Sequence, residues 1–157
     1  MSDTLPALVA DIGGTNTRVA LADGIGWYND SKGTNVGATL AAINGLGAAI
    51  GGKLLLIAGG VGKGQDFSPL SPALAQFGKT LLLIGEDGPA IDRAVSAPLD
   101  RRYCATLDEA IAQARALAQA GDAVLLSPAC ASLDMFKHYE DRGDQFAAGV
   151  QRLLEGT

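Results

Sequence analysis

Short runs of apolar residues alternate with segments of helical period along most of the chain. Continuous apolar runs of this length are typical of strands that are covered on both faces of a parallel sheet. They lie at residues 53–58, 80–84 and 122–126, and each leads into a turn rich in Gly or Ser. Strands that alternate with helices predict parallel βαβ units. We therefore expect an α/β fold, a Rossmann-like three-layer α/β/α sandwich with a mostly parallel sheet.

The first part of the chain has a different pattern. Strand-like runs at 5–12 and 17–22 flank a turn at 13–16, and Asp23-Gly24 is a hairpin signal that leads into a strand carrying Trp27. The sequence therefore predicts an N-terminal antiparallel β-hairpin.

Helix starts are marked by residues suited to capping. Thr34 and Asn35 are good N-cap residues for a helix that begins at Val36 and ends near 45–47. Thr106 and Glu109 form a capping-box pattern. Further helices are predicted over 69–77 (capped by Ser68), 89–95, 107–119 and 141–154, with a short edge strand over 102–105.

Composition narrows the class of protein. A chain of 157 residues with 48% hydrophobic residues has the size and the apolar content of one folded domain, which we expect over 1–157. The net charge of −5, without any Lys/Arg-rich run, argues against nucleic acid and anionic membranes as partners. Two cysteines, Cys104 and Cys130, are too few for a disulfide framework and indicate buried thiols in a cytoplasmic protein.

Several motifs follow one another along the chain, namely Trp27–Asn35, Gly59–Lys63, Asp66–Leu70, Gly85–Gly88, Leu126–Lys137 and Glu140–Gly143. In this order they resemble the C-terminal domain of the Mur ligases, in particular the ligases that add D-glutamate to a peptidoglycan precursor. The resemblance extends over residues 25–154. One departure is Gly33, where the family usually carries Ala.

A second resemblance covers residues 7–23, which are similar to the N-terminal phosphate-binding hairpin of glucokinase-type sugar kinases. It implies that Asp11 approaches a metal–phosphate unit and that Gly13, Gly14 and Thr15 form a phosphate-binding turn. The alternative is a plain turn between two strands. From the two resemblances we infer an engineered chimera joined near residues 23–24, so that a glucokinase-like segment over 1–24 precedes a Mur-like domain over 25–157.

The Mur resemblance also implies site residues. Asp30 and Lys32 would lie toward a nucleotide. Without the resemblance, Lys63 is an exposed residue of a Gly-rich loop and Ser132 caps a turn. The residues expected to line a D-glutamate pocket are Lys63, Thr34, Ser132, Leu133 and Phe136.

Catalysis is not expected of this sequence. The related ligases use ATP and Mg²⁺ positioned by a P-loop, whereas Gly59–Gly64 lacks the spacing and the Ser/Thr of that motif. His138 has no second ligand at metal spacing, so we expect no metal site and no cofactor. The sequence predicts a folded domain without turnover of its own that requires no partner. Alternatives are a residual module that binds D-glutamate or nucleotide weakly, and partial ligase activity with a complementing ATPase domain. A homodimer through an edge strand also stays open.

Overall fold

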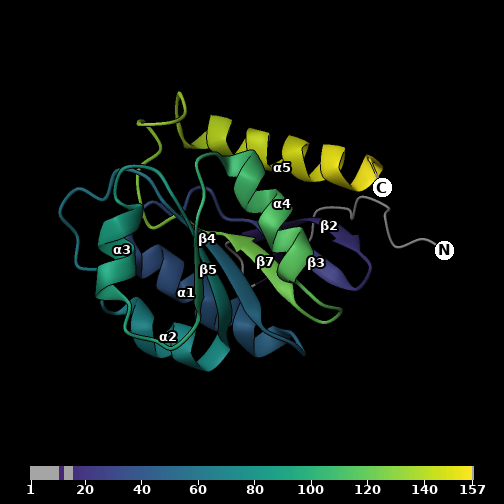
Figure 1. Ribbon diagram of the computed structural model, residues 1–157, viewed down its shortest axis with the longest axis horizontal. Helices are drawn as coiled ribbons and strands as arrows, with labels where there is room; N and C mark the ends of the chain where they lie inside the picture. The colour runs from purple at the N-terminus through teal and green to yellow at the C-terminus, as the bar shows by residue number, and fades with distance from the viewer. Residues whose placement is uncertain (1–10, 13–15, 157) are drawn as a thin grey trace.

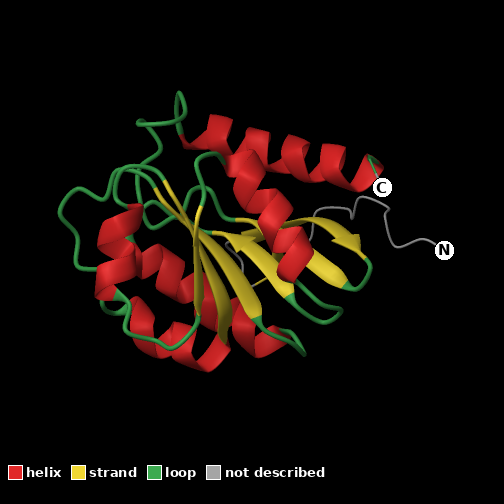
Figure 2. Cartoon of the chain, viewed as in Figure 1, coloured by secondary structure: helices red, strands yellow, loops and turns green. Residues whose placement is uncertain are grey.

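A computed structural model describes residues 11–12 and 16–156 and shows a three-layer α/β/α architecture (Figures 1 and 2). A seven-stranded sheet has the order β1-β2-β3-β7-β4-β5-β6. The expected fold class is confirmed. The strands are β1 (Asp11–Ile12), β2 (Asn16–Ala22), β3 (Ile25–Asn29), β4 (Leu54–Gly59), β5 (Gly78–Ile84), β6 (Asp100–Tyr103) and β7 (Ala123–Leu126). The helices are α1 (Val36–Ala49), α2 (Leu70–Phe77), α3 (Gly88–Ala94), α4 (Leu107–Leu117) and α5 (Tyr139–Glu155).

The five strands from β3 to β6 in the sheet order are parallel, as the βαβ pattern requires. Alternate residues of β4 point to opposite faces. Leu54 and Leu56 join a core with α1, α2 and α3, whereas Leu55 and Ile57 join a core with α4 and α5. All six β4 residues are buried, which explains why the strand reads as one continuous apolar run.

The hairpin at Asp23-Gly24 is confirmed. Strands β2 and β3 pair antiparallel, and both turn residues have positive φ, 55° and 79°, as a tight two-residue hairpin turn requires. Ala20 and Ala22 of β2 are buried, so this strand belongs to the core. Of the strand predicted over 5–12 the structure describes residues 11–12, which form β1, whereas residues 5–10 and residues 13–15 of the predicted turn lie outside the described residues.

Some helix boundaries differ from the prediction. Helix α1 continues to Ala49, past the glycines expected to end it. Gly47 packs against the Phe77 ring, where a Cβ would lie 2.4 Å from Phe77 Cγ, so this glycine is required by packing and does not end the helix. Pro69 occupies the N-cap of α2 without a side-chain hydrogen bond, so the cap predicted at Ser68 is wrong.

Helix α4 ends at Leu117, two residues early, since the amide of Gln119 donates to Asp122 Oδ2 instead of continuing the helix. The capping box at its start is half correct. Thr106 Oγ1 accepts from the Glu109 amide, but the Glu109 carboxylate accepts from the amide of Ala105.

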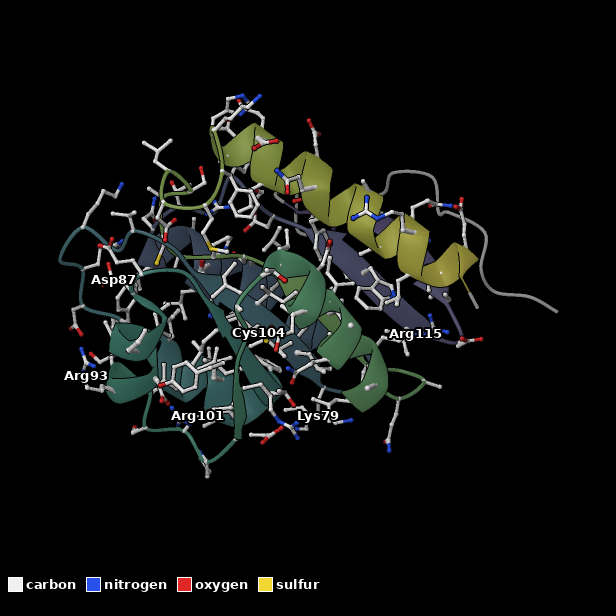
Figure 3. All side chains as sticks on the ribbon, turned by 45° about the horizontal axis from the view of Figure 1, so that its top comes forward. Lys79, Asp87, Arg93, Arg101, Cys104 and Arg115 are labelled. Carbon is white, nitrogen blue, oxygen red and sulfur yellow. The ribbon has the colours of Figure 1, made fainter. Side chains whose placement is uncertain are left out.

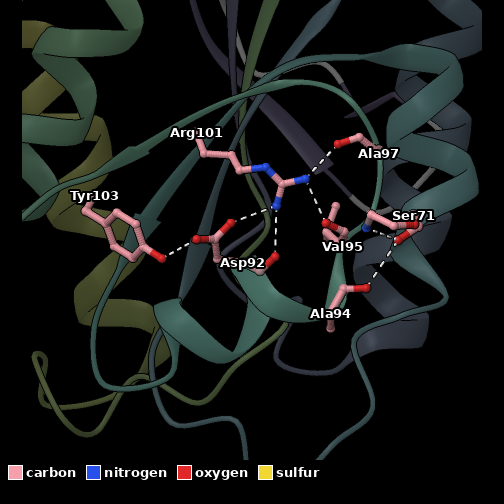
Figure 4. A network of polar contacts seen from close by, with 8 residues as sticks. Ser71, Asp92, Ala94, Val95, Ala97, Arg101 and Tyr103 are labelled. Carbon is pink, nitrogen blue, oxygen red and sulfur yellow. Dashed lines mark hydrogen bonds and ion pairs between the residues drawn. The ribbon is translucent and has the colours of Figure 1, made fainter.

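The edge strand β6 begins two residues earlier than predicted and is held by Arg101 (Figure 4). Its guanidinium donates to Asp92 Oδ1 and to three carbonyls, those of Asp92, Val95 and Ala97, at 2.6–2.8 Å. Tyr103 of the same strand donates its hydroxyl to Asp92. Arg101 therefore satisfies carbonyls within and just after the C-terminal turn of α3 and ties that turn to the sheet edge.

Candidate functional site

Three neighbouring parallel strands, β3, β7 and β4, end at one edge of the sheet, and each is followed by a loop with predicted site residues. The Thr34 loop (30–35) follows β3, the Ser132 loop (127–137) follows β7, and the Lys63 loop (60–66) follows β4. The carboxyl ends of parallel strands are where α/β sheets bind ligands. The fold therefore brings Thr34, Ser132 and Lys63 to the same edge, as the sequence implied.

Backbone hydrogen bonds fix these loops to one another. Val61 and Ala131 form an isolated antiparallel bridge, with both N–H groups donating across it at 2.9 Å. The amide of Ala129 donates to the carbonyl of Gly33 at 2.8 Å, which joins the Ser132 loop to the Thr34 loop. The three loops thus form a connected layer over the strand ends.

Gln65 connects the Lys63 loop to the Ser132 loop and to the first residue of α1, directly after the Thr34 loop, a role that sequence reasoning missed. Its Nε2 donates to the carbonyls of Gly62 (2.8 Å) and Ala129 (3.0 Å), and its Oε1 accepts from the amide of Val36 at 2.9 Å. The last contact supplies a partner for one of the free N–H groups at the start of α1. A glutamine in a Gly-rich run carries no sequence signal for such a brace.

Arg142 is a second brace that the sequence did not reveal. This residue of α5 is fully buried. Its Nε donates to Ser31 Oγ (2.9 Å), its Nη2 to the Ser31 carbonyl (2.6 Å) and its Nη1 to the Cys130 carbonyl (3.1 Å). Burial lowers the pKa of Arg142 to about 10, so the guanidinium is charged at neutral pH. One cation therefore holds the Thr34 loop and the Ser132 loop together.

The predicted pocket residues differ in exposure. Lys63 and Leu133 are exposed, Thr34 is half-buried, and Ser132 is 3% exposed. Lys63 has a φ of 56°, a conformation that costs a non-glycine residue free energy and is concentrated at functional sites. A charged side chain thus stands out from a strained position beside two hydroxyl-bearing loops.

Phe136 is placed elsewhere. It lines a cavity of about 270 Å³ between α4 and α5, and none of the other four predicted pocket residues lines that cavity. The Phe136 amide also donates to the Ser132 carbonyl at 2.9 Å, and the assignment of Phe136 to a D-glutamate pocket stays a prediction. The cavity is lined by Thr106, Leu107, Asp108, Met135, Phe136 and Gln145.

The two residues expected near a nucleotide have opposite environments. Lys32 is exposed, whereas Asp30 is 3% exposed and accepts a hydrogen bond from Ser127 Oγ at 2.8 Å. Burial raises the pKa of Asp30, and the Ser127 hydrogen bond and the charges of Lys32 and Arg142 partly oppose this. The Asp30 carboxyl therefore faces the protein, and its nucleotide role stays a prediction.

The kinase-type phosphate loop cannot be placed. Asp11 lies in β1, which pairs antiparallel with β2, but its side chain is outside the described part of the structure. Gly13, Gly14 and Thr15 are likewise outside the described residues.

A run that resembles a P-loop, Gly78-Lys79-Thr80, lies at the start of β5, at the end of the sheet remote from Asp87 (Figure 3). The Lys79 ammonium pairs with Asp122 at 2.8 Å. A P-loop connects a strand to the helix that follows it, whereas this run connects α2 to the next strand. Lys79 therefore forms a structural ion pair with Asp122, and the run is not a P-loop.

Other reactive side chains have structural roles. Burial raises the pKa of Cys104 to about 11 and that of Cys130 to about 12, so both thiols are protonated at neutral pH. His138 is the N-cap of α5, where its Nδ1 accepts a hydrogen bond from the amide of Asp141. Within residues 11–12 and 16–156, no group of three or more metal-binding side chains occurs. No helix of this part of the chain is long and apolar enough to cross a membrane.

Comparison with known proteins decides the family. The sequence profile described as Mur ligase, glutamate ligase domain, matches residues 17–130. The chain belongs to this family. It is 53% identical over 135 residues to the UDP-N-acetylmuramoylalanine–D-glutamate ligase of Hahella chejuensis, covering 86% of this chain and 30% of that protein. The corresponding ligase of Pseudomonas aeruginosa is 56% identical over 130 residues, covering 83% and 29%. The chain thus corresponds to the C-terminal domain of a peptidoglycan ligase and spans about three tenths of these relatives.

Solved structures show the same fold. The MurF ligase of Thermotoga maritima, crystallised in complex with ADP, aligns with a TM-score of 0.59 at 14% identity, covering 96% of this chain and 33% of that one. The murein peptide ligase Mpl of Psychrobacter arcticus aligns with a TM-score of 0.58 at 16% identity, covering 88% and 28%. At these identities the likeness shows the architecture alone.

Nothing in these matches supports a glucokinase-type origin for residues 7–23 or an engineered chimera. The family match begins at residue 17 and runs through the junction that we inferred near 23–24. In the structure the same junction is a regular hairpin turn between two paired strands. The Mur resemblance is confirmed, and the chimera inference is left without support.

Proposed function

We propose that this Mur ligase C-terminal domain binds the incoming acidic amino acid of a D-glutamate-adding ligase at the edge formed by the Thr34, Ser132 and Lys63 loops. The observation that carries the proposal is that the loops bearing Lys63, Thr34 and Ser132 follow three neighbouring parallel strands and are joined to one another by backbone hydrogen bonds. Carboxylates accept charge-assisted hydrogen bonds from such groups. The two curated relatives add D-glutamate by name, which favours that amino acid.

Affinity in this domain alone is expected to be low. Lys63 is exposed, and exposed ion pairs contribute only about 0–1 kcal/mol each. Two or three contacts of this kind must also offset the translational and rotational cost of association. A dissociation constant in the millimolar range, corresponding to about −4 kcal/mol, is the expected result.

Turnover requires more than this edge. Acyl-phosphate chemistry needs bound ATP and Mg²⁺ aligned with the acceptor, and no G-x-x-x-x-G-K-[ST] motif occurs in the 157 residues. We therefore propose that the domain binds and positions an amino acid, and that catalysis depends on an ATPase domain acting with it. Phosphate release with ATP, Mg²⁺ and D-glutamate should not exceed the buffer rate; a rate abolished by Lys63→Ala would contradict this part.

The binding proposal is tested by titrating D-glutamate into ¹⁵N-labelled protein and following amide NMR shifts. Shifts should be confined to the three loops and should disappear in Lys63→Ala. Lys53→Ala is the matched control, because Lys53 is also an exposed lysine but precedes β4 at the opposite edge of the sheet. Saturating shifts that persist in Lys63→Ala, or that disappear equally in Lys53→Ala, would refute the assignment.

A further inference from the structure

Three buried polar side chains form a hydrogen-bonded row beneath the Thr34 loop. Asp30 is 3% exposed, and Ser127 and Thr39 are fully buried. Ser127 Oγ lies 2.8 Å from Asp30 Oδ2 and 3.0 Å from Thr39 Oγ1, and Thr39 Oγ1 lies 3.2 Å from the Ser127 carbonyl. The loop after β3, the end of β7 and the first half of α1 are thereby joined through side chains.

Both protonation states of Asp30 are compatible with this hydrogen-bonded row. When the carboxyl is ionised, Ser127 donates to it and Thr39 donates to the Ser127 carbonyl. When the carboxyl is protonated, it donates to Ser127 Oγ, and Ser127 donates to Thr39 Oγ1 in turn. Each hydroxyl has one hydrogen to donate, and none of the three side chains loses its hydrogen-bond partner in either state.

The charges around Asp30 are few. Lys32, on its own loop, and Arg142, from α5, are the two cations that act on it. Helix α1, which supplies Thr39, contains no charged residue. The Asp30 carboxyl thus faces hydroxyls rather than a direct ion-pair partner among the described residues.

Gly33 closes the space above this hydrogen-bonded row. A Cβ at residue 33 would lie 2.7 Å from both Asp30 Oδ2 and Ser127 Oγ, and 3.0 Å from the Asp30 carbonyl. Real Cβ atoms do not lie this close to other atoms, so a side chain at 33 requires the Asp30 carboxyl and the Ser127 hydroxyl to shift from their present positions. The Gly33 amide also donates to the Asp30 carbonyl at 2.8 Å, which closes the turn over the carboxyl.

We propose that Gly33 makes Asp30 an inward-facing positioning residue, which holds the Thr34 loop on the end of β7 through Ser127. Asp30 then sets the position of Lys32 and Thr34. A side chain at 33 moves the carboxyl out to the ligand edge and adds a negative charge beside Lys32. The identity of residue 33 therefore determines whether this edge presents a free carboxylate.

The test is an NMR pH titration of the Asp30 side-chain carboxyl in the full chain. In the unsubstituted protein Asp30 should titrate above the usual range of aspartate. Gly33→Ala should lower the pKa of Asp30 toward its ordinary value, because the carboxyl becomes solvated, and should lower the melting temperature by about 5 °C. Gly45→Ala is the matched control: a Cβ there meets no atom within 4 Å, so neither quantity should fall.

Ser127→Ala gives a prediction of opposite sign. The carboxyl stays buried but loses the hydroxyl that donates to its ionised form, so the pKa of Asp30 should rise. This variant decides the matter if Gly33→Ala does not fold. An unchanged pKa of Asp30 in Gly33→Ala, or a lower one in Ser127→Ala, would overturn the inference. Neither measurement uses D-glutamate, so a failure here is distinct from a failure of the proposed binding function.

Discussion

Replacing Arg142 tests how the ligand edge is held together. The substitution Arg142→Met keeps an unbranched side chain of similar length in the buried space but removes every donor. Two carbonyls, those of Ser31 and Cys130, then lose their donor, whereas the Ser31 hydroxyl keeps its hydrogen bond to the Tyr139 carbonyl. No carboxylate of the described residues lies within ion-pair distance of the guanidinium, but the buried Asp30 carboxyl loses one of the two cations that favour its ionised form.

The change in the free energy of unfolding caused by Arg142→Met follows from two opposing effects. Each buried carbonyl left without a donor costs about 1–3 kcal/mol, which gives about 2–6 kcal/mol for the pair. Burying a guanidinium is itself unfavourable, and its removal returns part of this cost. We expect a net loss of about 3 kcal/mol in the free energy of unfolding. For a domain of this size that corresponds to a decrease of about 6–12 °C in melting temperature.

Urea unfolding followed by circular dichroism measures the change directly. Arg152→Met, on the exposed face of the same helix, is the matched control and should change stability by less than about 0.5 kcal/mol. Arg142→Lys keeps the charge but has no planar fork to reach three acceptors, so it should fall between the two. The reasoning fails if Arg142→Met is as stable as Arg152→Met.

Three further substitutions have expected outcomes. Arg101→Ala removes the donor shared by three carbonyls at the end of α3 and should cost about 1–3 kcal/mol in urea unfolding, with faster amide hydrogen exchange in β6; unchanged exchange would refute the role of Arg101. Burial raises the pKa of Asp122, but the hydrogen bonds from Lys79 and from the amides of Lys53 and Gln119 together lower it by a larger amount, so the net shift of this pKa is downward. The stability that this shift provides is present above the ordinary aspartate value of 3.8 and is lost as pH falls through the lowered value; urea midpoints at pH 7 and pH 3 should therefore differ more in the natural chain than in Asp122→Asn, and equal differences would contradict this. Gln65→Ala should broaden or shift amide NMR signals in all three edge loops while leaving β6 unchanged, and shifts confined to its own loop would show that Gln65 is no brace.

The sequence predicts the layers of the fold well because the driving pattern is local. The runs at 54–58 and 80–84 are apolar on both faces, and only a covered parallel strand fits them. The hairpin at 23–24 and the cap at Asn35 are short-range signals, and both are observed. Boundaries failed where a distant contact overrides propensity, as at Gly47, where the Phe77 ring requires the absence of a side chain.

The hydrogen bonds by which Gln65 and Arg142 join the loops of the candidate site were not predictable, because they too depend on residues far apart in the sequence. Arg142 and Ser31 are 111 positions apart, and neither residue type signals the contact. The inward orientation of Asp30 depends on Ser127, 97 positions away, and on the missing side chain of Gly33. The convergence of Thr34, Ser132 and Lys63, in contrast, follows from strand order once the parallel sheet is accepted.

The central claim is that Lys63 holds a ligand rather than the fold, and Lys63→Gly tests it most directly. Lys63 has a φ of 56°, which glycine adopts without strain, so this substitution should raise the free energy of unfolding by about 1 kcal/mol. The same variant lacks the ammonium, so the D-glutamate-induced shifts in the three loops should vanish. A gain in stability together with a loss of binding is the predicted result. Saturable D-glutamate shifts that survive in Lys63→Gly would contradict the account.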